Sequence, residues 1–310
     1  MASKTAKQSL SHLERTAAEP RDETLHRVLL TNIDPVNPTI RLFRLSPVLE
    51  PGWRPITFLP GQWLDVYVPG ISKAGGFTIT SPPSLLQPPS NYLELAIQKS
   101  PSNPPAAWLW QEEERILGSQ LQVRVGGSFV WPPPLLSNGE SGVEEKGAGK
   151  ATRVVFIAGG VGINPLMSIV SHLEQTAREA GKLGLVVKFF YTTRDPGPHT
   201  NPSEILFLER LISVFDTLGN EGQFQLFLTS GQNGGEEVRS EKHVVGVKGI
   251  EIQRRRIHHT DLLDALGPIE ERKRTICYIC GIPTMTDEFV EKAKNAEGMN
   301  EANVLSEKWW

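Results

Sequence analysis

Short runs in which apolar and polar residues alternate dominate the chain between residues 24 and 130. In residues 92–98, Leu93, Leu95 and Ile97 alternate with Glu, Ala and Gln, which is the period of a strand with one face toward a core. Comparable runs cover residues 39–45, 62–68, 77–80 and 120–130, and Pro and Gly clusters separate them. Residues 23–131 are therefore predicted to form a small antiparallel β-barrel or sandwich.

The pattern changes after residue 152, where apolar strands alternate with helical segments. Residues 153–158, 185–191, 224–228 and 275–280 are rich in Val, Ile, Leu and Phe, as expected of strands in a sheet covered on both faces. An apolar stripe at helical spacing runs through residues 165–180, and further helices are expected to begin after Ser203 and Thr284. Residues 152–310 are predicted to form an α/β domain with a five-stranded parallel sheet.

Two segments lack the signature of a packed core. Residues 132–151 contain consecutive prolines followed by Ser, Asn, Gly, Glu and Lys, a composition typical of an inter-domain linker. Residues 1–22 carry Lys4, Lys7 and Arg15 with no acidic residue before Glu14. This tail is interpreted either as a mitochondrial targeting segment or as a disordered polar tail, with a cytoplasmic location as the alternative.

Composition and charge exclude several classes of function. A chain of 310 residues with 39% hydrophobic residues has the length of roughly two domains. The net charge of −3 gives no broad positive field for nucleic acid, and no apolar run has the length of a membrane-spanning helix. Cys277 and Cys280 are too few for a disulfide framework or an iron–sulfur cluster, and on one strand their side chains would point to opposite faces.

The strongest chemical signal is an apolar strand that enters a glycine-rich turn and opens an amphipathic helix. Glycines permit tight or left-handed backbone and close approach of a ligand, while the start of a helix attracts a diphosphate. Pro165 suits the first turn of that helix. A packing turn between strand and helix is the competing interpretation. The candidate binding residues are Gly159, Gly160, Val161, Gly162, Ile163, Asn164 and Pro165.

This Gly-Gly-x-Gly-x-x-Pro turn, followed in order by Cys280-Gly-Ile-Pro283, resembles the nicotinamide half of the ferredoxin-NADP reductase family. The segments Gly75-Gly-Phe-Thr-Ile-Thr-Ser81 and Glu307-Lys-Trp-Trp310 are most similar to the oxidoreductase NAD-binding domain-containing proteins, a mitochondrial branch. The resemblance covers nearly the whole chain except the tail and the linker. It implies that the barrel binds a flavin, FAD or FMN, and that the α/β domain binds NAD(H) or NADP(H).

The family's flavin motif, R-x-Y-S/T, falls on Gly75, Gly76, Phe77 and Thr78. The resemblance implies that Phe77 lies against the flavin ring, although it could equally be a barrel core residue, and that Thr78 hydrogen-bonds near the reactive nitrogen. A glycine replaces the arginine that would pair with the flavin phosphate. The phosphate-receiving helix start corresponds to residues 103–107, where prolines lack N–H donors. A weaker flavin site, or none, follows.

The resemblance places Cys280 beside the nicotinamide ring, with Gly281 and Pro283 completing that end of the site. A buried structural thiol is the alternative for Cys280. Glu307 corresponds to a carboxylate near the reacting ring, and Trp310 or Trp309 to an aromatic residue that covers the flavin; a capping strand is the alternative for this segment. Arg194 would lie near the adenosine ribose, where it could pair with a 2′-phosphate or accompany plain NAD(H), which is slightly favoured.

These features predict a flavin-dependent NAD(P)H oxidoreductase, with Thr78, Cys280 and Glu307 as its catalytic candidates. Hydride would pass between the dinucleotide and a bound flavin, and electrons would leave to a separate acceptor. The alternative is a non-catalytic dinucleotide-binding protein that has lost its flavin. A direct NAD-dependent dehydrogenase is less favoured, since no residues suited to acid–base chemistry on a carbonyl stand out.

Overall fold

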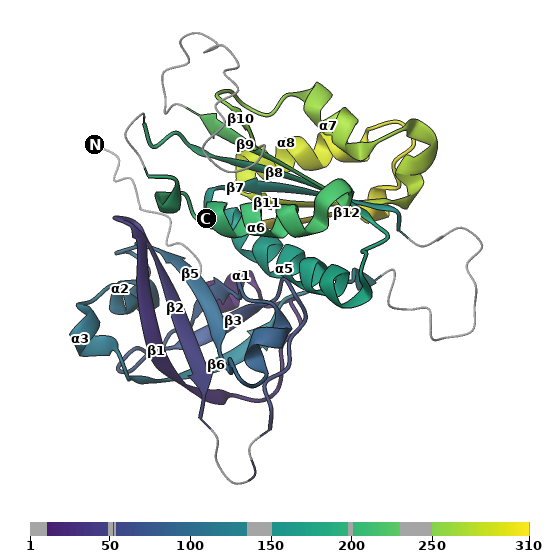
Figure 1. The fold of residues 1–310 in the computed structure, drawn as a ribbon. Helices are drawn as coiled ribbons and strands as arrows, with labels where there is room; N and C mark the ends of the chain where they lie inside the picture. The colour runs from purple at the N-terminus through teal and green to yellow at the C-terminus, as the bar shows by residue number, and fades with distance from the viewer. Residues whose placement is uncertain are drawn as a thin grey trace, which may run out of the picture.

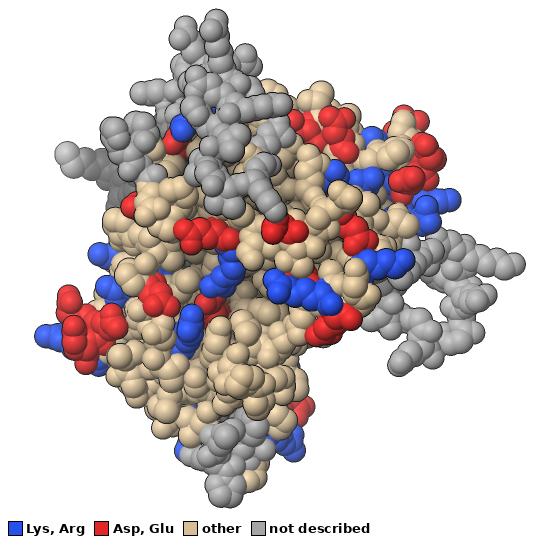
Figure 2. Space-filling view, in the orientation of Figure 1, with Lys and Arg blue, Asp and Glu red and all other residues tan. Residues whose placement is uncertain are grey.

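The computed structural model describes residues 11–48, 52, 54–134, 151–197, 201–229 and 250–309. Two sheets lie one beside the other, and the helix α5 (Ile163–Ala180) lies between them (Figure 1). In the described part of the chain, no helix has the length and apolar character needed to cross a membrane. Basic and acidic side chains are interspersed on the face shown in Figure 2.

The N-terminal sheet is an antiparallel barrel, as predicted. Its strands are β1 (His26–Asn37), β2 (Ile40–Pro47), β3 (Trp63–Tyr67), β4 (Gly75–Thr78), β5 (Leu93–Gln98) and β6 (Gln120–Gly126). Their order is β4-β3-β6-β1-β2-β5, and a bridge between Ile79 and Leu95 joins the two outer strands. The short helices α2 (Pro104–Leu109) and α3 (Glu113–Ile116) contribute Ala106, Leu109 and Ile116 to the barrel core. β1 was not predicted, because Pro35 and several polar residues interrupt its apolar run.

The C-terminal sheet is parallel, but it has six strands rather than the five expected. These are β7 (Arg153–Gly159), β8 (Val186–Arg194), β9 (Gly222–Thr229), β10 (Glu251–Gln253), β11 (Thr275–Gly281) and β12 (Val304–Lys308), in the order β10-β9-β8-β7-β11-β12. The three-residue β10 is too short to show a period and is defined by its pairing with β9. β12 is a strand, as the alternative interpretation of the C-terminal segment held.

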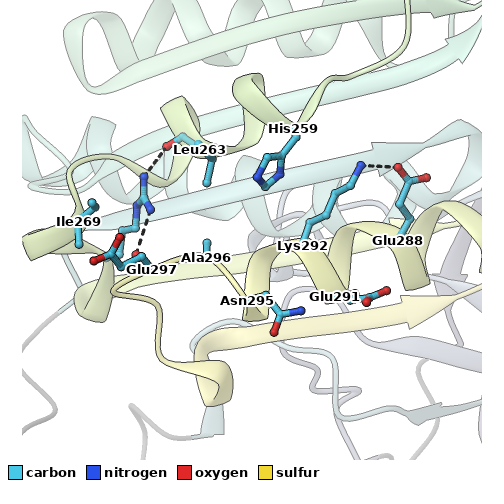
Figure 3. A pocket seen from close by; sticks show the side chains of 10 residues that line it. His259, Leu263, Ile269, Glu288, Glu291, Lys292, Asn295, Ala296 and Glu297 are labelled. Atoms are coloured by element: carbon cyan, nitrogen blue, oxygen red, sulfur yellow. Dashed lines mark hydrogen bonds and ion pairs between the residues drawn. The ribbon is translucent and has the colours of Figure 1, made fainter.

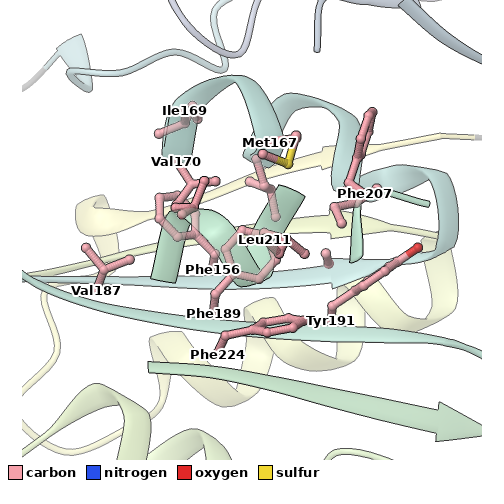
Figure 4. Packing of buried hydrophobic residues seen from close by; sticks show 14 of the residues in the cluster. Phe156, Met167, Ile169, Val170, Val187, Phe189, Tyr191, Phe207, Leu211 and Phe224 are labelled. Atoms are coloured by element: carbon pink, nitrogen blue, oxygen red, sulfur yellow. The ribbon is translucent and has the colours of Figure 1, made fainter. Parts of the chain in front are cut away.

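Helices cover both faces of this sheet. α5 and α6 (Leu208–Leu218) share a core with Phe156 and Phe189 (Figure 4), while α7 (His259–Leu266) and α8 (Pro283–Lys294) share a core with Val155 and Ile157. Adjacent residues of β7 thus enter opposite cores, which explains its continuous apolar run. The helix expected after Ser203 begins only at Leu208, because a 3-10 turn and the left-handed Phe207, with φ of 62°, precede it.

The two cysteines lie on opposite faces of β11, as predicted. Cys277 belongs to the core beneath α7 and α8, and Cys280 belongs to the core beneath α5. Both thiols are free and buried, and burial raises the pKa of Cys277 to about 12. A dithiol redox pair is therefore excluded by the direction of the side chains.

Part of the N-terminal segment differs from the disordered tail expected over residues 1–22. Residues 12–15 form the short helix α1 (His12–Arg15), whose first side chain is buried against the barrel. Residues 1–10 lie outside the described residues, as does most of the expected linker, residues 135–150. The targeting role of the N-terminus stays a prediction.

Polar contacts join the two sheets around α5 and α6. On α5, Asn164 Nδ2 donates to the Ala96 carbonyl at 2.9 Å and Ser168 Oγ donates to the Ser81 carbonyl at 2.8 Å. From α6, Arg210 donates to both carboxylate oxygens of Glu94, at 2.6 and 3.0 Å. Glu94 is only 2% exposed, so this bidentate pair secures α6 to β5.

Replacing Arg210 with Ala is expected to lower the free energy of unfolding by about 2 kcal/mol, because the buried Glu94 carboxylate would lose its charged partner. Urea unfolding followed by circular dichroism measures the change. The control is Arg178→Ala, which removes an exposed pair with Glu174 and should cost less than about 0.5 kcal/mol. Equal losses in the two variants would contradict a stabilising inter-sheet pair.

Candidate functional site

The glycine-rich turn is held against the end of β11 by backbone contact. β7 ends at Gly159, a 3-10 turn covers Gly160–Gly162, and α5 begins at Ile163. A Cβ atom on Gly162 would lie 2.4 Å from the Cys280 carbonyl oxygen and 2.6 Å from the Gly281 Cα. Only glycine fits this approach. The two motifs of the family resemblance, far apart in sequence, therefore form one site.

The turn also leaves room for a ligand. Gly160 has a positive φ of 53°, and an added Cβ atom would have no heavy atom within 4 Å. Nearby, Asn164 is 7% exposed, and its Oδ1 atom has no hydrogen-bond partner among the described residues. A buried acceptor without a donor is costly, so a ligand that brings a donor to this turn fits the site. The open space at Gly160 suits the diphosphate of a dinucleotide. Asn164 Oδ1 needs a hydroxyl or amide donor, which a diphosphate lacks.

The other predicted residues of the turn differ in accessibility. Val161 is half-buried, whereas Ile163 and Pro165 are buried where α5 packs against the sheet and the barrel. The burial of Ile163 and Pro165 fixes the first turn of α5 against its neighbours. Their contact with a dinucleotide stays a prediction.

Cys280 and Gly281 end β11 on the same edge of the sheet as the turn, and Pro283 begins α8. The Cys280 thiol has no exposed surface. Burial, reinforced by the nearby Glu307 charge and only partly opposed by a hydrogen bond with Trp309, raises its pKa well above the usual range. Cys280 is therefore a neutral thiol suited to lining a ring, and a nucleophilic role does not fit.

Glu307 lies next to Cys280, because the two residues are paired between β12 and β11. It is half-buried, and its Oε2 atom accepts a hydrogen bond from Trp309 Nε1 at 3.1 Å. Burial raises the Glu307 pKa to about 8; the Trp309 hydrogen bond lowers it and the charge of Glu19 raises it. At neutral pH this carboxyl group holds a proton. Trp310, the predicted ring cover, lies outside the described residues.

A small cleft of about 170 Å³ opens beside Glu307. Its lining comes from the N-terminal segment, the chain after β6, and β12: Glu19, Ser128, Phe129, Leu305, Ser306 and Glu307. Glu19 and Ser128 were not predicted as site residues. No local motif marks them, since only the folded chain brings them to β12.

The residues that correspond to the flavin motif lie on β4, and their packing does not suit a site for the flavin phosphate. Phe77 is 8% exposed and belongs to the barrel core, while Thr78 is 2% exposed. A Cβ atom on Gly75 would lie 2.6 Å from the Phe77 ring and 2.8 Å from Pro105 Cβ. An arginine side chain has no room there.

The helix start that would receive the phosphate also lacks free N–H donors. Pro104 and Pro105 have no N–H groups, the Asn103 side chain caps the Ala106 N–H, and the Asn103 carbonyl accepts from the Ala107 N–H at 2.8 Å. These residues do not fit the diphosphate or phosphate of a tightly held flavin. The contacts predicted for Phe77 and Thr78 with a flavin ring stay predictions.

Arg194 is exposed at the end of β8, the edge at which the turn lies. The neighbouring Asp195 pairs with Arg254, and Arg255 pairs with Asp261 at 2.6 Å. Ion pairs therefore account for two members of the basic run 254–256. The ribose contact of Arg194 stays a prediction.

A larger cavity of about 560 Å³ lies between α7 and α8 (Figure 3). The Arg272 side chain beside it donates to the carbonyl groups of Gly267, Leu263 and Glu297, which explains its burial. None of the predicted site residues lines this cavity. Across the described ranges there is also no group of three His, Cys, Asp or Glu residues arranged to hold a metal ion.

Solved structures show where this fold occurs. The chain superposes on the Amycolatopsis cytochrome P450 reductase GcoB with a TM-score of 0.63 and 16% identity, covering 93% of this chain and 71% of that one. A ferredoxin NADP+ reductase from Neisseria gonorrhoeae with bound FAD and NADP gives a TM-score of 0.57 and 15% identity. This superposition covers 93% of this chain and 98% of the reductase. The fold is that of the ferredoxin-NADP reductases.

Sequence comparison gives the family. No family model matches the chain. Oxidoreductase NAD-binding domain-containing protein 1 of Homo sapiens is 30% identical over 98% of this chain and 86% of its own length. The Danio rerio protein of the same name is 30% identical over 99% of this chain and 100% of its own length. The predicted resemblance is confirmed, and the chain belongs to the family of oxidoreductase NAD-binding domain-containing protein 1.

Proposed function

We propose that this protein is an NAD(P)H-dependent oxidoreductase whose dinucleotide lies across the carboxyl edge of the C-terminal sheet. The diphosphate lies at the turn of Gly159, Gly160 and Gly162, and the nicotinamide ring lies by Cys280 and Gly281. The observation that carries this proposal is the backbone contact of Gly162 with Cys280 and Gly281, which joins both motifs. The open face of Gly160 supports it.

The residues beside the ring suit hydride transfer. A neutral Cys280 thiol adds no charge near the nicotinamide, and the protonated Glu307 carboxyl can supply a proton when a reduced acceptor takes one up. Phe129 and Leu305 provide apolar lining in the cleft where the acceptor would enter. The contributions of this chain are therefore orientation of the dinucleotide, exclusion of water and supply of a proton by Glu307.

A flavin is one candidate acceptor. The Neisseria gonorrhoeae neighbour is described with bound FAD, and a Rhodococcus jostii relative, 28% identical over 61% of this chain and 44% of its own length, is the reductase component of propane 2-monooxygenase. These names support electron transfer to a separate partner. The lack of space for an arginine side chain at Gly75 favours a second candidate function, a dinucleotide-binding protein without flavin. A slight preference for NAD(H) over NADP(H) and a mitochondrial location are further proposals, and both rest on the family resemblance.

The visible absorption spectrum tests these functions. The purified protein is examined before and after incubation with FAD or FMN and removal of free flavin, and then with NADH or NADPH under anaerobic conditions. A retained yellow chromophore that one nucleotide bleaches would identify a flavin reductase and its donor. A colourless protein that binds NADH would indicate the second function. Absence of binding to either nucleotide would overturn the proposal.

Replacing Gly162 with Ala is expected to weaken NADH binding by about tenfold or more, since the new methyl group would displace backbone at the centre of the site. Isothermal titration calorimetry measures the dissociation constant. Gly181→Asn is the matched control: Gly181 ends the same helix with a positive φ and open space, which asparagine tolerates. A dinucleotide affinity unchanged in Gly162→Ala would argue for a site elsewhere.

Glu307 should make stability depend on pH. Its pKa is raised from 4.5 to about 8, so the unfolded chain releases this proton at a lower pH than the folded chain. Its contribution is complete below pH 4.5 and is lost as pH rises to about 8. Glu307→Gln lacks this loss and should be more stable than the parent protein by about 2 kcal/mol at pH 8.5, with no gain at pH 4. Urea unfolding at both pH values checks the difference.

A further inference from the structure

The N-terminal segment of residues 11–22 is anchored by a buried ion cluster on the outer face of the barrel. His12 Nε2 lies 2.9 Å from Asp65 Oδ1, and Arg21 and Arg124 donate to Asp65 Oδ2 at 3.1 and 2.7 Å. Asp65 has no exposed surface. Burial alone would raise its pKa, but hydrogen bonds from His12, Arg124 and Arg21 outweigh that effect and lower it. The charge cluster is therefore satisfied only while the segment is in place.

The barrel has a surface shaped for this segment. A Cβ atom on Gly76 would lie 2.1 Å from the His12 ring, so a larger residue would expel the histidine. The same ring packs edge-on against Trp63 at a centroid distance of 4.8 Å. Backbone hydrogen bonds from Asp22 N to the Val125 carbonyl and from Gly127 N to the Pro20 carbonyl, at 2.8 and 2.9 Å, fix the path beyond the helix.

This path brings Glu19 to the cleft that also contains Glu307. Glu19 Oε2 accepts hydrogen bonds from Ser128 N at 3.0 Å and from Ser128 Oγ at 2.6 Å, which hold the carboxyl group at the cleft wall. Both glutamates line the same small cavity. Two carboxyl groups from opposite ends of the described chain thus share one partly closed space.

The other polar groups around Glu307 have their own partners. On β11, the Cys280 thiol is buried and the Tyr278 hydroxyl donates to the Val130 carbonyl at 2.7 Å. On β12, Lys308 pairs with Asp287 of α8 at 2.5 Å, and the Trp309 indole donates to Glu307. Besides Glu307, Glu19 is the acidic residue in the lining of the cleft.

We propose that the segment of residues 11–22 completes the reaction cleft and that Glu19 is a positioning residue that acts through Glu307. The negative charge of Glu19 opposes ionisation of Glu307, so the Glu307 proton is retained beside Cys280. Ser128 sets the position of Glu19, and the Asp65 cluster sets the position of the segment. This inference deepens the proposed function, because Glu307 is the proton-holding group beside the nicotinamide end of the site.

The test is the titration of Glu307 in the nucleotide-free protein, followed by NMR of ¹³C-labelled glutamate carboxyl groups and assigned with Glu307→Gln. The expected midpoint is near pH 8 in the parent protein. In Glu19→Gln the midpoint should fall by roughly half a pH unit, about a threefold loss of proton affinity, because the like charge is removed while the amide oxygen can still accept from Ser128. Ser128→Ala, which frees Glu19 without changing any charge, should lower it by a smaller amount.

Glu23→Gln is the matched control, since Glu23 is an exposed glutamate just beyond the same segment and does not line the cleft. In Glu23→Gln, the pH midpoint of the Glu307 titration should equal that of the parent protein. A midpoint that stays unchanged in Glu19→Gln, or that falls equally in Glu23→Gln, would overturn the inference. Because no dinucleotide is present, this outcome is separate from failure of NADH binding, which would overturn only the proposed function.

Discussion

The close approach of the α5 N-terminus to the end of β11 is the constraint on which the rest of the structure depends. Gly162 lies against the Cys280 carbonyl and Gly281, and the first turns of the same helix are buried between the sheet and the barrel. A helix enclosed on two sides cannot shift without disturbing both cores. The position of the turn follows from this approach, and the hydrogen bonds of Asn164 and Ser168 to the barrel make its orientation depend on the same helix.

Charge is distributed in a way that secures this arrangement. Glu94 and Asp65 are buried carboxylates with arginine partners, one at the contact between the sheets and one beneath the N-terminal segment. Among the described residues Glu307 forms no ion pair, and the group keeps its proton instead. The charge of an acidic group is thus compensated by ion pairing where the chain must be held, and avoided by protonation where chemistry is proposed.

Much of the α/β domain could be predicted because its signals are local. The apolar run of β7, the glycines of the turn and Pro165 all act within one stretch of chain. β1 and β10 were missed because polar residues interrupt the first and the second has only three residues. The contact of His12 with Asp65, and hence the position of Glu19, depends on segments far apart in sequence, and no period or spacing encodes such a contact.

In the described part of the chain, β12 is the outermost strand of its sheet and pairs with β11 alone. Residues 11–22 join the barrel through the bridge between Arg21 and Gly126, the Asp65 side-chain cluster and the Glu19–Ser128 hydrogen bonds. Peripheral elements of this kind open locally at a lower free-energy cost than central strands. The rim of the cleft at β12 is therefore expected to open at a lower free-energy cost than the two cores or the Arg210–Glu94 contact.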